Sequence, residues 1–397
     1  DRVGDAAATL PDLTVAQHGP AVERDANPEE VTPGFASENP PLTERQWDKR
    51  AQELGDLDEH PGTDGASVHD VTEGEGTRVA VIDTGIYDAH PDLEVNGDRS
   101  ANFTEDPDDW RPNGAGDHGT HVAGTVAATT GPDGNGVVGT APSTELVSFR
   151  VFSGEAGAGG DVLAAIVAAG DAGCDAANLS LGIPYATIAQ LPRSVVEQYA
   201  QLYGAAVAYA RGEGTVVVNS AGNSGLDLDP ADVFTLPTAL DGTFAVSATG
   251  PIGYMWGKGR NHSHNALAPG QLDDPVTEPA FYTNYGGSSV DVSAAGGNID
   301  RSAADPDAAN DLVFSTIYRA DEETGEPVPG YGWKAGTSMA APQVSGAVAL
   351  ARSLRPDASV AEVEDLIRET ASTPEEGEKY HGDGHLDVPA LVDAAAK

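Results

Sequence analysis

Three polar motifs along the chain carry side chains that together could perform acyl transfer. Asp83 ends an apolar run in Ile-Asp-Thr-Gly, His118 lies in Asp-His-Gly-Thr-His, and Ser338 lies in Gly-Thr-Ser-Met-Ala. A serine hydroxyl is a weak nucleophile until a base takes its proton, and histidine can do this near neutral pH. A carboxylate holds the imidazole in the correct tautomer and stabilises its cation. The motifs therefore indicate a serine nucleophile, a histidine base and an orienting aspartate.

A fourth motif could stabilise the negative charge that develops on a carbonyl oxygen in such a reaction. Asn223 lies in Gly-Asn-Ser-Gly, shortly after an apolar run at 215–219, and its amide can donate a hydrogen bond. Ser338 lies at the start of a predicted helix, where backbone N–H groups and the helix dipole add positive potential. Asn223 and that helix start are therefore the expected oxyanion donors.

The same residues also fit other kinds of site, which the rest of the sequence disfavours. Asp-Thr-Gly is half of an aspartic protease dyad, but the chain has no second copy of Asp-Thr-Gly or Asp-Ser-Gly. His118 and His121 are spaced like some zinc ligands, but no His-Glu-x-x-His motif accompanies them. We expect His121 to pack beside the site rather than to bind a metal.

The elements that could position these motifs alternate along the chain. Six short apolar runs predict buried strands, at residues 78–83, 145–151, 175–181, 215–219, 243–248 and 289–293. Helical patterns lie between or after them, at residues 118–128, 162–172, 194–213, 337–353 and 360–371. This alternation predicts a doubly wound α/β fold of three layers with a parallel central sheet. The four functional residues would then meet at the carboxyl ends of the strands.

The remaining segments are polar and lack a sustained apolar period. We expect residues 1–42 to be an N-terminal extension or the remnant of a processed segment, and residues 43–397 to form one catalytic domain. Residues 250–278 resemble a surface insertion, and 303–311 and 320–330 look similar. The first insertion holds Trp256, His262 and His264, which we assign to a surface loop in preference to a metal or substrate site.

The composition excludes several classes of function. The chain has 397 residues, 63 acidic against 21 basic side chains and a net charge of −42. Nucleic acid and anionic membrane surfaces require a basic face, and no apolar run approaches the roughly 20 residues of a spanning helix. Cys174 is the single cysteine, so it forms no internal disulfide, and we expect a buried, inert thiol.

The acidity has two explanations. Only five of the basic residues are lysines, and the acidic residues are scattered along the chain. This pattern indicates adaptation to concentrated salt, which would screen the mutual repulsion of the carboxylates. The simpler explanation is a soluble acidic protein.

The four motifs, in this order, resemble those of the subtilisin-like serine proteases, the subtilases. The resemblance spans about residues 46–391 outside the insertions, and it includes Asn-Leu-Ser-Leu-Gly at 178–182 and Tyr-Thr-Asn-Tyr at 282–285. It implies that Asp83, His118 and Ser338 form the triad in that family's order, with Asn223 and the Ser338 N–H as oxyanion donors. The acidic composition points to secreted haloarchaeal members in particular.

The resemblance also implies where a peptide substrate binds. One extended edge, to which substrate would add as a strand, would be formed by Gly157, Ala158 and Gly159. Backbone hydrogen bonds and the lining of the pocket before the scissile bond would come from Ser180, Leu181 and Gly182, and a wall of small residues from Ser220, Ala221 and Gly222. Recognition that reads the main chain first suggests broad specificity for peptides and proteins.

A structural calcium ion is a further implication of the resemblance. Calcium prefers carboxylate and carbonyl oxygens. The matching positions are the side chains of Asp92 and Asp133 and the carbonyls of Gly131, Asn135 and Val137, with Gln46 a weaker candidate. Two features depart from the family pattern: Pro132 and Asp133 replace an amide-rich loop, and Gln343 replaces a histidine outside the triad, where we expect little effect.

The resemblance finally implies an extracellular monomer whose own prodomain takes part in maturation. Two alternatives to a broad endopeptidase stay open. One is a processing protease dedicated to a single partner, with residues 250–278 as the selector. The other is a non-catalytic pseudoprotease.

Overall fold

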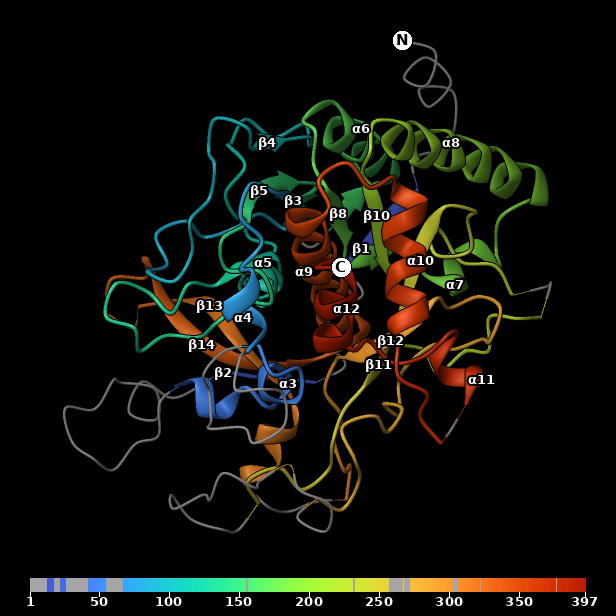
Figure 1. Ribbon diagram of the computed structural model, residues 1–397. Coiled ribbons are helices and arrows are strands. Elements are labelled where there is room, and N and C mark those ends of the chain that lie inside the picture. Colours follow the sequence, from blue (N-terminus) through green and yellow to red (C-terminus); the bar gives the residue numbers. More distant parts are fainter. Residues whose placement is uncertain are drawn as a thin grey trace.

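A seven-stranded sheet, in the order β12-β11-β10-β8-β3-β5-β4, runs through the centre of the computed structural model (Figure 1). The structure describes residues 13–17, 22–25, 42–54, 67–154, 156–230, 233–256, 267, 272–302, 306–321, 323–375 and 377–397. The strands are β3 (Arg78–Asp83), β4 (Ala101–Asn102), β5 (Glu145–Arg150), β8 (Ala176–Leu179), β10 (Val216–Ser220), β11 (Thr243–Thr249) and β12 (Val292–Ala295). Every neighbouring pair is parallel. The predicted doubly wound α/β sheet is confirmed.

Helices cover both faces of this sheet and complete the three layers. On one face lie α5 (His118–Ala127) and α9 (Thr337–Leu354), with α10 (Val360–Thr370) and α12 (Val388–Ala395) packed on α9. On the other face lie α6 (Gly159–Asp171) and α8 (Arg193–Gly212). The shorter helices are η1 (Leu42–Arg45), α3 (Trp47–Ala51), α4 (Val68–Val71), α7 (Tyr185–Ile188), η2 (Pro306–Asp311) and α11 (Glu378–His381). Within the described residues, none of the helices is long and apolar enough to cross a membrane.

Strand alternation decides which layer each side chain enters. In β3, Val79 and Val81 belong to the core shared with α5 and α9, whereas Ala80 and Ile82 belong to the core shared with α6 and α8. Successive strand residues point to opposite faces. Asp83 continues the odd-numbered series, so its carboxylate enters the layer of α5 and α9, which carry His118 and Ser338.

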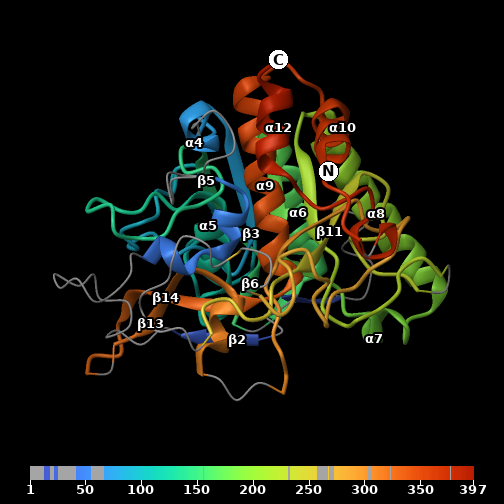
Figure 2. The same cartoon turned by 60° about the horizontal axis from the view of Figure 1, so that its bottom comes forward.

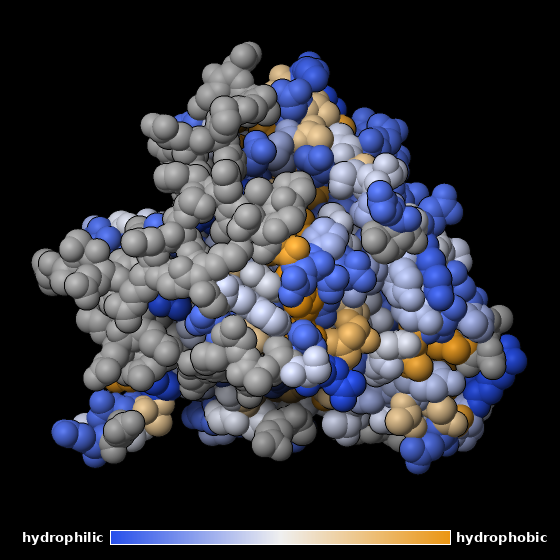
Figure 3. Space-filling model, turned by 90° about the horizontal axis from the view of Figure 1, so that it is seen from below, coloured by the Kyte–Doolittle hydropathy of each residue, from blue (hydrophilic) through white to orange (hydrophobic). Residues whose placement is uncertain are grey.

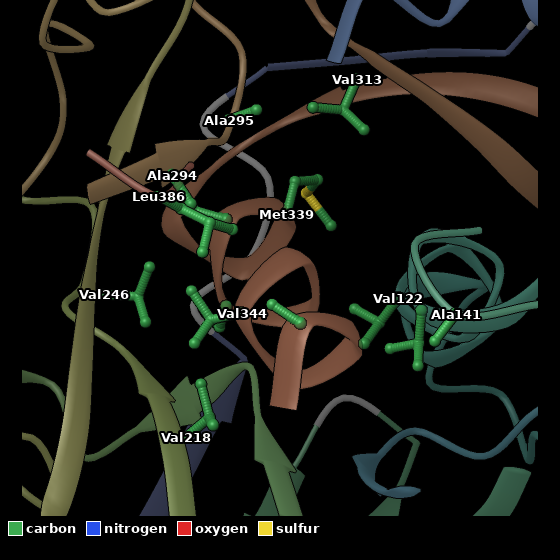
Figure 4. Packing of buried hydrophobic residues seen from close by; sticks show 14 of the residues in the cluster. Val122, Ala141, Val218, Val246, Ala294, Ala295, Val313, Met339, Val344 and Leu386 are labelled. Carbon is green, nitrogen blue, oxygen red and sulfur yellow. The ribbon is translucent and has the colours of Figure 1, made fainter. Parts of the chain in front are cut away.

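Helix α9 is buried along nearly its whole length because small residues let its neighbours approach closely. It packs on β8, β10, β11, β12, α5 and α12. Figure 4 shows Val344 of α9 facing Val218 and Val246 of the sheet, with Met339 nearer the start of the helix. A Cβ atom on Gly346 would lie 2.5 Å from the Cβ of Thr140, so only glycine fits there.

A buried polar network ties helix α3 to α9. The Lys49 Nζ donates to Gln343 Oε1 at 2.6 Å, and Gln343 Nε2 donates to Asp48 Oδ2 at 2.7 Å. All three side chains are buried, and burial lowers the pKa of Lys49 to about 8. Gln343, which stands where the family pattern has histidine, is the polar link between the two helices.

Two smaller sheets lie beside the central one. One has the order β6-β7-β1-β9 and the other β13-β14-β2. Their strands are β1 (Thr14–Gln17), β2 (Val22–Asp25), β6 (Phe152–Ser153), β7 (Ala156–Ala158), β9 (Leu181–Gly182), β13 (Val313–Ala320) and β14 (Pro327–Ala335). Figure 2 shows β13, β14 and β2 together at the end of the molecule away from the C-terminus.

The sequence interpretation was wrong about parts of these peripheral segments. Within the assigned insertion at 320–330, Ala320 ends β13 and residues 327–330 begin its antiparallel partner β14. The two prolines and two glycines of β14 concealed this strand because they oppose strand formation. The start of the assigned insertion at 250–278 is not on the surface, since residues 251–254 are buried. Asp311, in the assigned loop at 303–311, is also buried. His262 and His264 lie outside the described residues.

Close packing between α5 and β13 gives a test of this architecture. A Cβ atom on Gly124 would lie 2.2 Å from Thr316 Oγ1, whereas one on Gly204 of α8 would meet nothing within 4 Å. We expect Gly124→Ala to lower the free energy of unfolding by about 1–3 kcal/mol through overpacking. Gly204→Ala should raise it by about 0.5–1 kcal/mol through helix propensity. Denaturant titration measures both, and equal effects would contradict the packing.

Candidate active site

A buried hydrogen bond joins the predicted orienting carboxylate to the predicted base. The Nδ1 of His118 donates to the two carboxylate oxygens of Asp83, at 2.9 and 3.0 Å. Asp83 is the last residue of β3 and His118 the first of α5, and both are buried. Within the described residues, the Nε2 of His118 has no hydrogen-bond partner. The imidazole is therefore held on its Nδ1 side, and its buried Nε2 is the nitrogen that could act as a base.

Glycines allow the strand end and the helix start to come this close. The Gly119 N–H donates to Thr84 Oγ1 at 2.9 Å, next to Asp83. A Cβ atom on Gly119 would lie 2.5 Å from the carbonyl oxygen of Gly85. Gly85 itself has a φ of +98°, which disfavours other residues. The glycines of the Asp-Thr-Gly and His-Gly-Thr motifs thus allow the two backbones to pack in direct contact.

Ser338 is the second residue of α9 and is buried at the amino end of that helix. Its Oγ donates to the Ser180 carbonyl at 3.3 Å, and its own carbonyl accepts from Ser180 Oγ at 2.9 Å. The hydroxyl is thus directed toward the residue that follows β8, not hydrogen bonded to His118. Catalytic hydrogen bonds are often long or absent without substrate and form in the complex.

Asn223 is oriented by the residue that precedes the serine. Its Oδ1 accepts hydrogen bonds from the Thr337 N–H at 2.9 Å and from Thr337 Oγ1 at 2.8 Å. Thr337 Oγ1 also accepts from the Gly222 N–H at 3.0 Å. Because the amide oxygen accepts from Thr337, these two hydrogen bonds fix the orientation of the Asn223 side chain.

A second amide holds the loop that carries Asn223. Asn284 Oδ1 accepts from the N–H groups of Ser224 and Leu226 at 3.0 and 2.9 Å, and its Nδ2 donates to the Ala221 carbonyl at 2.8 Å. Sequence reasoning noticed the Tyr-Thr-Asn-Tyr segment but gave Asn284 no role. The structure makes it the support of the small-residue wall at 220–222.

The predicted substrate-binding residues form two edges that face each other across one strand. Gly157 and Ala158 lie in β7, with Gly159 at the start of α6, while Leu181 and Gly182 form β9. Ser180 lies directly before β9 and bonds to Ser338. Strand β1 of the N-terminal segment pairs with both edges. The sequence did not predict that this segment would reach the site.

The chain is similar to known proteins over most of its length. The subtilase family model matches residues 74–387. Subtilisin BL of Lederbergia lenta is 32% identical over 302 residues, which are 76% of this chain and 85% of that protein.

The chain belongs to the subtilase family.

As a subtilase it is a serine peptidase, a hydrolase. An alkaline protease of Shouchella clausii is also 32% identical, over 76% of this chain and 60% of that protein. A protease of Pseudoalteromonas arctica superposes on this subtilase with a TM-score of 0.66 at 27% identity, covering 91% of this chain and all of the other. An epidermin leader peptide processing protease of Staphylococcus aureus shares the fold, with a TM-score of 0.67 at 22% identity over 89% and 81% of the two chains.

The loop assigned to calcium wraps around a buried carboxylate in this subtilase. The Asp92 Oδ2 accepts from the Val137 N–H at 2.9 Å and from the Tyr331 hydroxyl at 3.0 Å. A Cβ atom on Gly136 would lie 2.1 Å from that oxygen. Burial raises the pKa of Asp92, as expected for a carboxylate with too little compensating positive charge. The recorded contacts of this carboxylate are thus with an N–H and a hydroxyl group, and the Gly131 and Val137 carbonyls accept from the Gly134 and Thr130 N–H groups.

The other predicted calcium ligands differ in burial and in the hydrogen bonds that they form. Gly131 is half-buried, whereas Asp133 and Asn135 are exposed. Gln46 is used elsewhere: its amide exchanges two hydrogen bonds with the backbone of Val138, both 2.9 Å long. Across the described part of the chain, no group of three or more His, Cys, Asp or Glu side chains is arranged to hold a metal. A calcium site here would thus depend on carbonyl oxygens.

The structure also shows the surroundings of His121 and Cys174, for which the sequence offered a packing role and an inert thiol. His121 donates from Nε2 to the Val313 carbonyl at 3.2 Å and is buried, and burial lowers its pKa far below the usual value. It therefore packs behind the site, as expected. Cys174 is buried and its pKa is raised to about 12, which suits an inert thiol.

One ion pair beside the site escaped sequence reasoning. Asp117, which precedes His118, lies 3.0 Å from the Nζ of Lys334, four residues before Ser338. Lys334 is buried in β14. The available signal was a charged residue next to each of two catalytic motifs in a chain with few lysines.

The Thr337 hydroxyl gives a specific test of how the oxyanion donor is oriented. Thr337→Val keeps the side-chain shape and the N–H bond to Asn223 but removes both hydroxyl bonds. We expect kcat to fall about tenfold, from loss of about 1.4 kcal/mol of orientation, with KM and the pH profile unchanged. Asn223→Ala should cost about 10²–10³ in kcat, which is the effect that removing the equivalent side-chain donor has in a subtilisin.

Steady-state kinetics on a peptide substrate measures both variants. Thr370→Val on α10 is the control, since it removes a hydroxyl that bonds only to its own helix. If Thr337→Val and Thr370→Val behave alike, Thr337 does not orient the donor.

Proposed function

We propose that this subtilase is an endopeptidase that hydrolyses peptide bonds through an acyl-enzyme. The single observation that carries the proposal is the buried Asp83–His118 hydrogen bond, which leaves the His118 Nε2 without a partner among the described residues, while Ser338 lies in the first turn of α9. The occupied positions argue against a non-catalytic pseudoprotease, because each position holds a residue competent for its role.

The proposed mechanism assigns one task to each group. His118 Nε2 takes the proton of Ser338 Oγ as the oxygen attacks the carbonyl carbon of the scissile bond, and it returns that proton to the leaving amine. Asp83 keeps the imidazole in the tautomer with its proton on Nδ1 and stabilises the cation. Asn223 Nδ2 and the Ser338 N–H donate to the oxyanion. Water then attacks the acyl-enzyme with the same histidine as base.

We further propose broad specificity in place of a single dedicated partner. The edges at 157–159 and 180–182 offer backbone groups, which bind any extended peptide. The wall at 220–222 is made of small residues and leaves room for large side chains. The processing protease of similar fold is only 22% identical, so it supports the fold and not a narrow specificity. An extracellular monomer matured from a prodomain form remains part of this proposal.

Labelling by a fluorophosphonate probe tests the mechanism directly. We expect the wild-type chain to react, and Ser338→Ala and His118→Ala to lose labelling and casein hydrolysis, because one removes the nucleophile and the other its base. Thermal unfolding of each variant serves as the control for folding. Casein hydrolysis by a folded Ser338→Ala variant would contradict the acyl-enzyme mechanism.

We also propose that calcium binds at Asp92 and the 131–137 loop, with Asp133 and the carbonyls of Gly131, Asn135 and Val137 as further ligands. The ion would supply positive charge to a buried carboxylate and clamp the loop to it. The packing of Gly136 against the Asp92 carboxylate supports a loop built around this side chain.

Salt adaptation is proposed on the basis of charge alone. The chain has a net charge of −42 on 397 residues, so its carboxylates repel one another at low ionic strength. Concentrated salt screens this repulsion. Figure 3 shows a face on which the coloured residues are mostly hydrophilic, with small separate hydrophobic patches. Such a surface stays solvated when salt screens the repulsion.

Thermal unfolding with varied salt and chelator tests both ideas. We expect Tm to fall when KCl is diluted, at constant calcium, and to fall again when EGTA is added at high KCl. Asp92→Asn should remove the EGTA effect while keeping the salt effect. A Tm independent of KCl would refute salt adaptation, and an EGTA effect that persists in Asp92→Asn would place calcium elsewhere.

A further inference from the structure

An ion pair joins the two chain segments that lead into the base and the nucleophile. The Nζ of Lys334 lies 3.0 Å from Asp117 Oδ1. Asp117 directly precedes His118, the first residue of α5, and Lys334 lies near the end of β14, just before Ser338. The pair is mostly buried, since the Lys334 side chain is 3% exposed and the Asp117 side chain 18%. Such a contact couples the position of the base to that of the nucleophile.

Asp117 occupies the N-cap position of α5 without using its side chain as a cap. Its backbone carbonyl accepts from the His121 N–H at 3.0 Å, but its carboxylate forms no cap hydrogen bond. An aspartate at this position usually accepts from an N–H of the first turn, and that bond stabilises a helix by about 1 kcal/mol. The Asp117 carboxylate therefore pairs with Lys334 in place of capping its own helix.

Two neighbours of the base that could carry charge are neutral in this site. Burial lowers the pKa of His121 far below its usual value, and the positive charges of Lys334 and His118 lower it further. Burial and the Asp117 carboxylate raise the pKa of Tyr318, on β13, to about 12. Both side chains are therefore uncharged near neutral pH.

The charged groups around the imidazole belong to three segments of the chain. Asp83 of β3 accepts from Nδ1, Asp117 precedes the imidazole in the chain, and Lys334 of β14 pairs with Asp117. Strand β2 also brings Glu23 into register with Lys334. A carboxylate beside His118 that lacked a counter-ion would stabilise the imidazolium and so reduce the fraction of neutral base. A lysine paired with that carboxylate opposes this effect.

We propose that Lys334 is a positioning residue for the peptidase reaction. It acts through Asp117, whose negative charge it compensates beside the base, and it joins the strand that leads to the serine to the helix that begins at the histidine. This inference rests on the proposed peptidase function. A buried ion pair often adds no net stability over apolar residues of similar size. A role in the reaction therefore accounts for a buried lysine here better than stability does.

Opposite single variants and their combination test this compensation. Lys334→Met removes the ammonium and keeps an unbranched side chain, so Asp117 loses this counter-ion. We expect the acid limb of the kcat/KM profile, measured at constant KCl, to move to higher pH by about 0.5–1 pH unit. Asp117→Asn leaves the ammonium and should move the limb to lower pH by a similar amount. The double variant should return the limb close to its wild-type position.

A matched control separates this effect from a change in net charge. Lys397→Met on α12 removes the lysine of an exposed pair with Asp393, and it should leave the acid limb unchanged. Thermal unfolding checks that each variant is folded, and Asp117→Asn gives the test by itself where Lys334→Met fails to fold. If both single variants move the limb in the same direction, or no further than Lys397→Met does, the inference is overturned.

An NMR titration keeps this inference distinct from the proposed catalysis. In a Ser338→Ala background, the Cε1–H resonance of His118 is followed against pH, with His118→Ala for its assignment. We expect the midpoint to rise in Lys334→Met and to fall in Asp117→Asn, whether or not the wild-type chain hydrolyses peptides. Equal midpoints in all variants would refute the role of Lys334. Absence of fluorophosphonate labelling in folded wild-type protein, with shifted midpoints, would refute the peptidase mechanism alone.

Discussion

Burial of α9 is the constraint on which the rest of the structure depends. A helix enclosed by the central sheet and by α5, α10 and α12 can only be packed if its neighbours come close, which its alanines and glycines permit. The position of its first turn is then fixed by the whole core and not by a loop. Ser338 and the backbone N–H groups around it are therefore also held in fixed positions. Preorganised stabilisation of an oxyanion requires such fixed donors.

A second layer of organisation is polar and lies directly around that first turn. Asn178 Nδ2 donates to Ser180 Oγ at 3.1 Å, and its Oδ1 accepts from Ser345 Oγ of α9 at 3.0 Å. Thr337 and Asn284 do the same for the loop of Asn223. Buried polar groups of this kind are costly unless all are satisfied. Their pairing joins the substrate edge, the oxyanion loop and the nucleophile into one unit.

The peripheral elements are attached to the outside of this unit. Strands β1 and β2 add to the free edges of β7, β9 and β14, the loop at 131–137 surrounds Asp92, and α3 is fastened to α9 through Gln343. Each rests on a preformed surface of the core.

Apolar alternation and helical period predicted most strands of the central sheet and its main helices, and local motifs predicted Asp83, His118, Asn223 and Ser338 as candidates, because these patterns are properties of neighbouring residues. Contacts that depend on pairing between distant segments are visible only in the folded chain. Strand β1 has four residues and little apolar character, so its place between β7 and β9 follows from the edges that receive it. The strand β14, the Lys334–Asp117 pair and the network of Gln343 likewise join residues far apart in the chain, and no local pattern encodes such contacts.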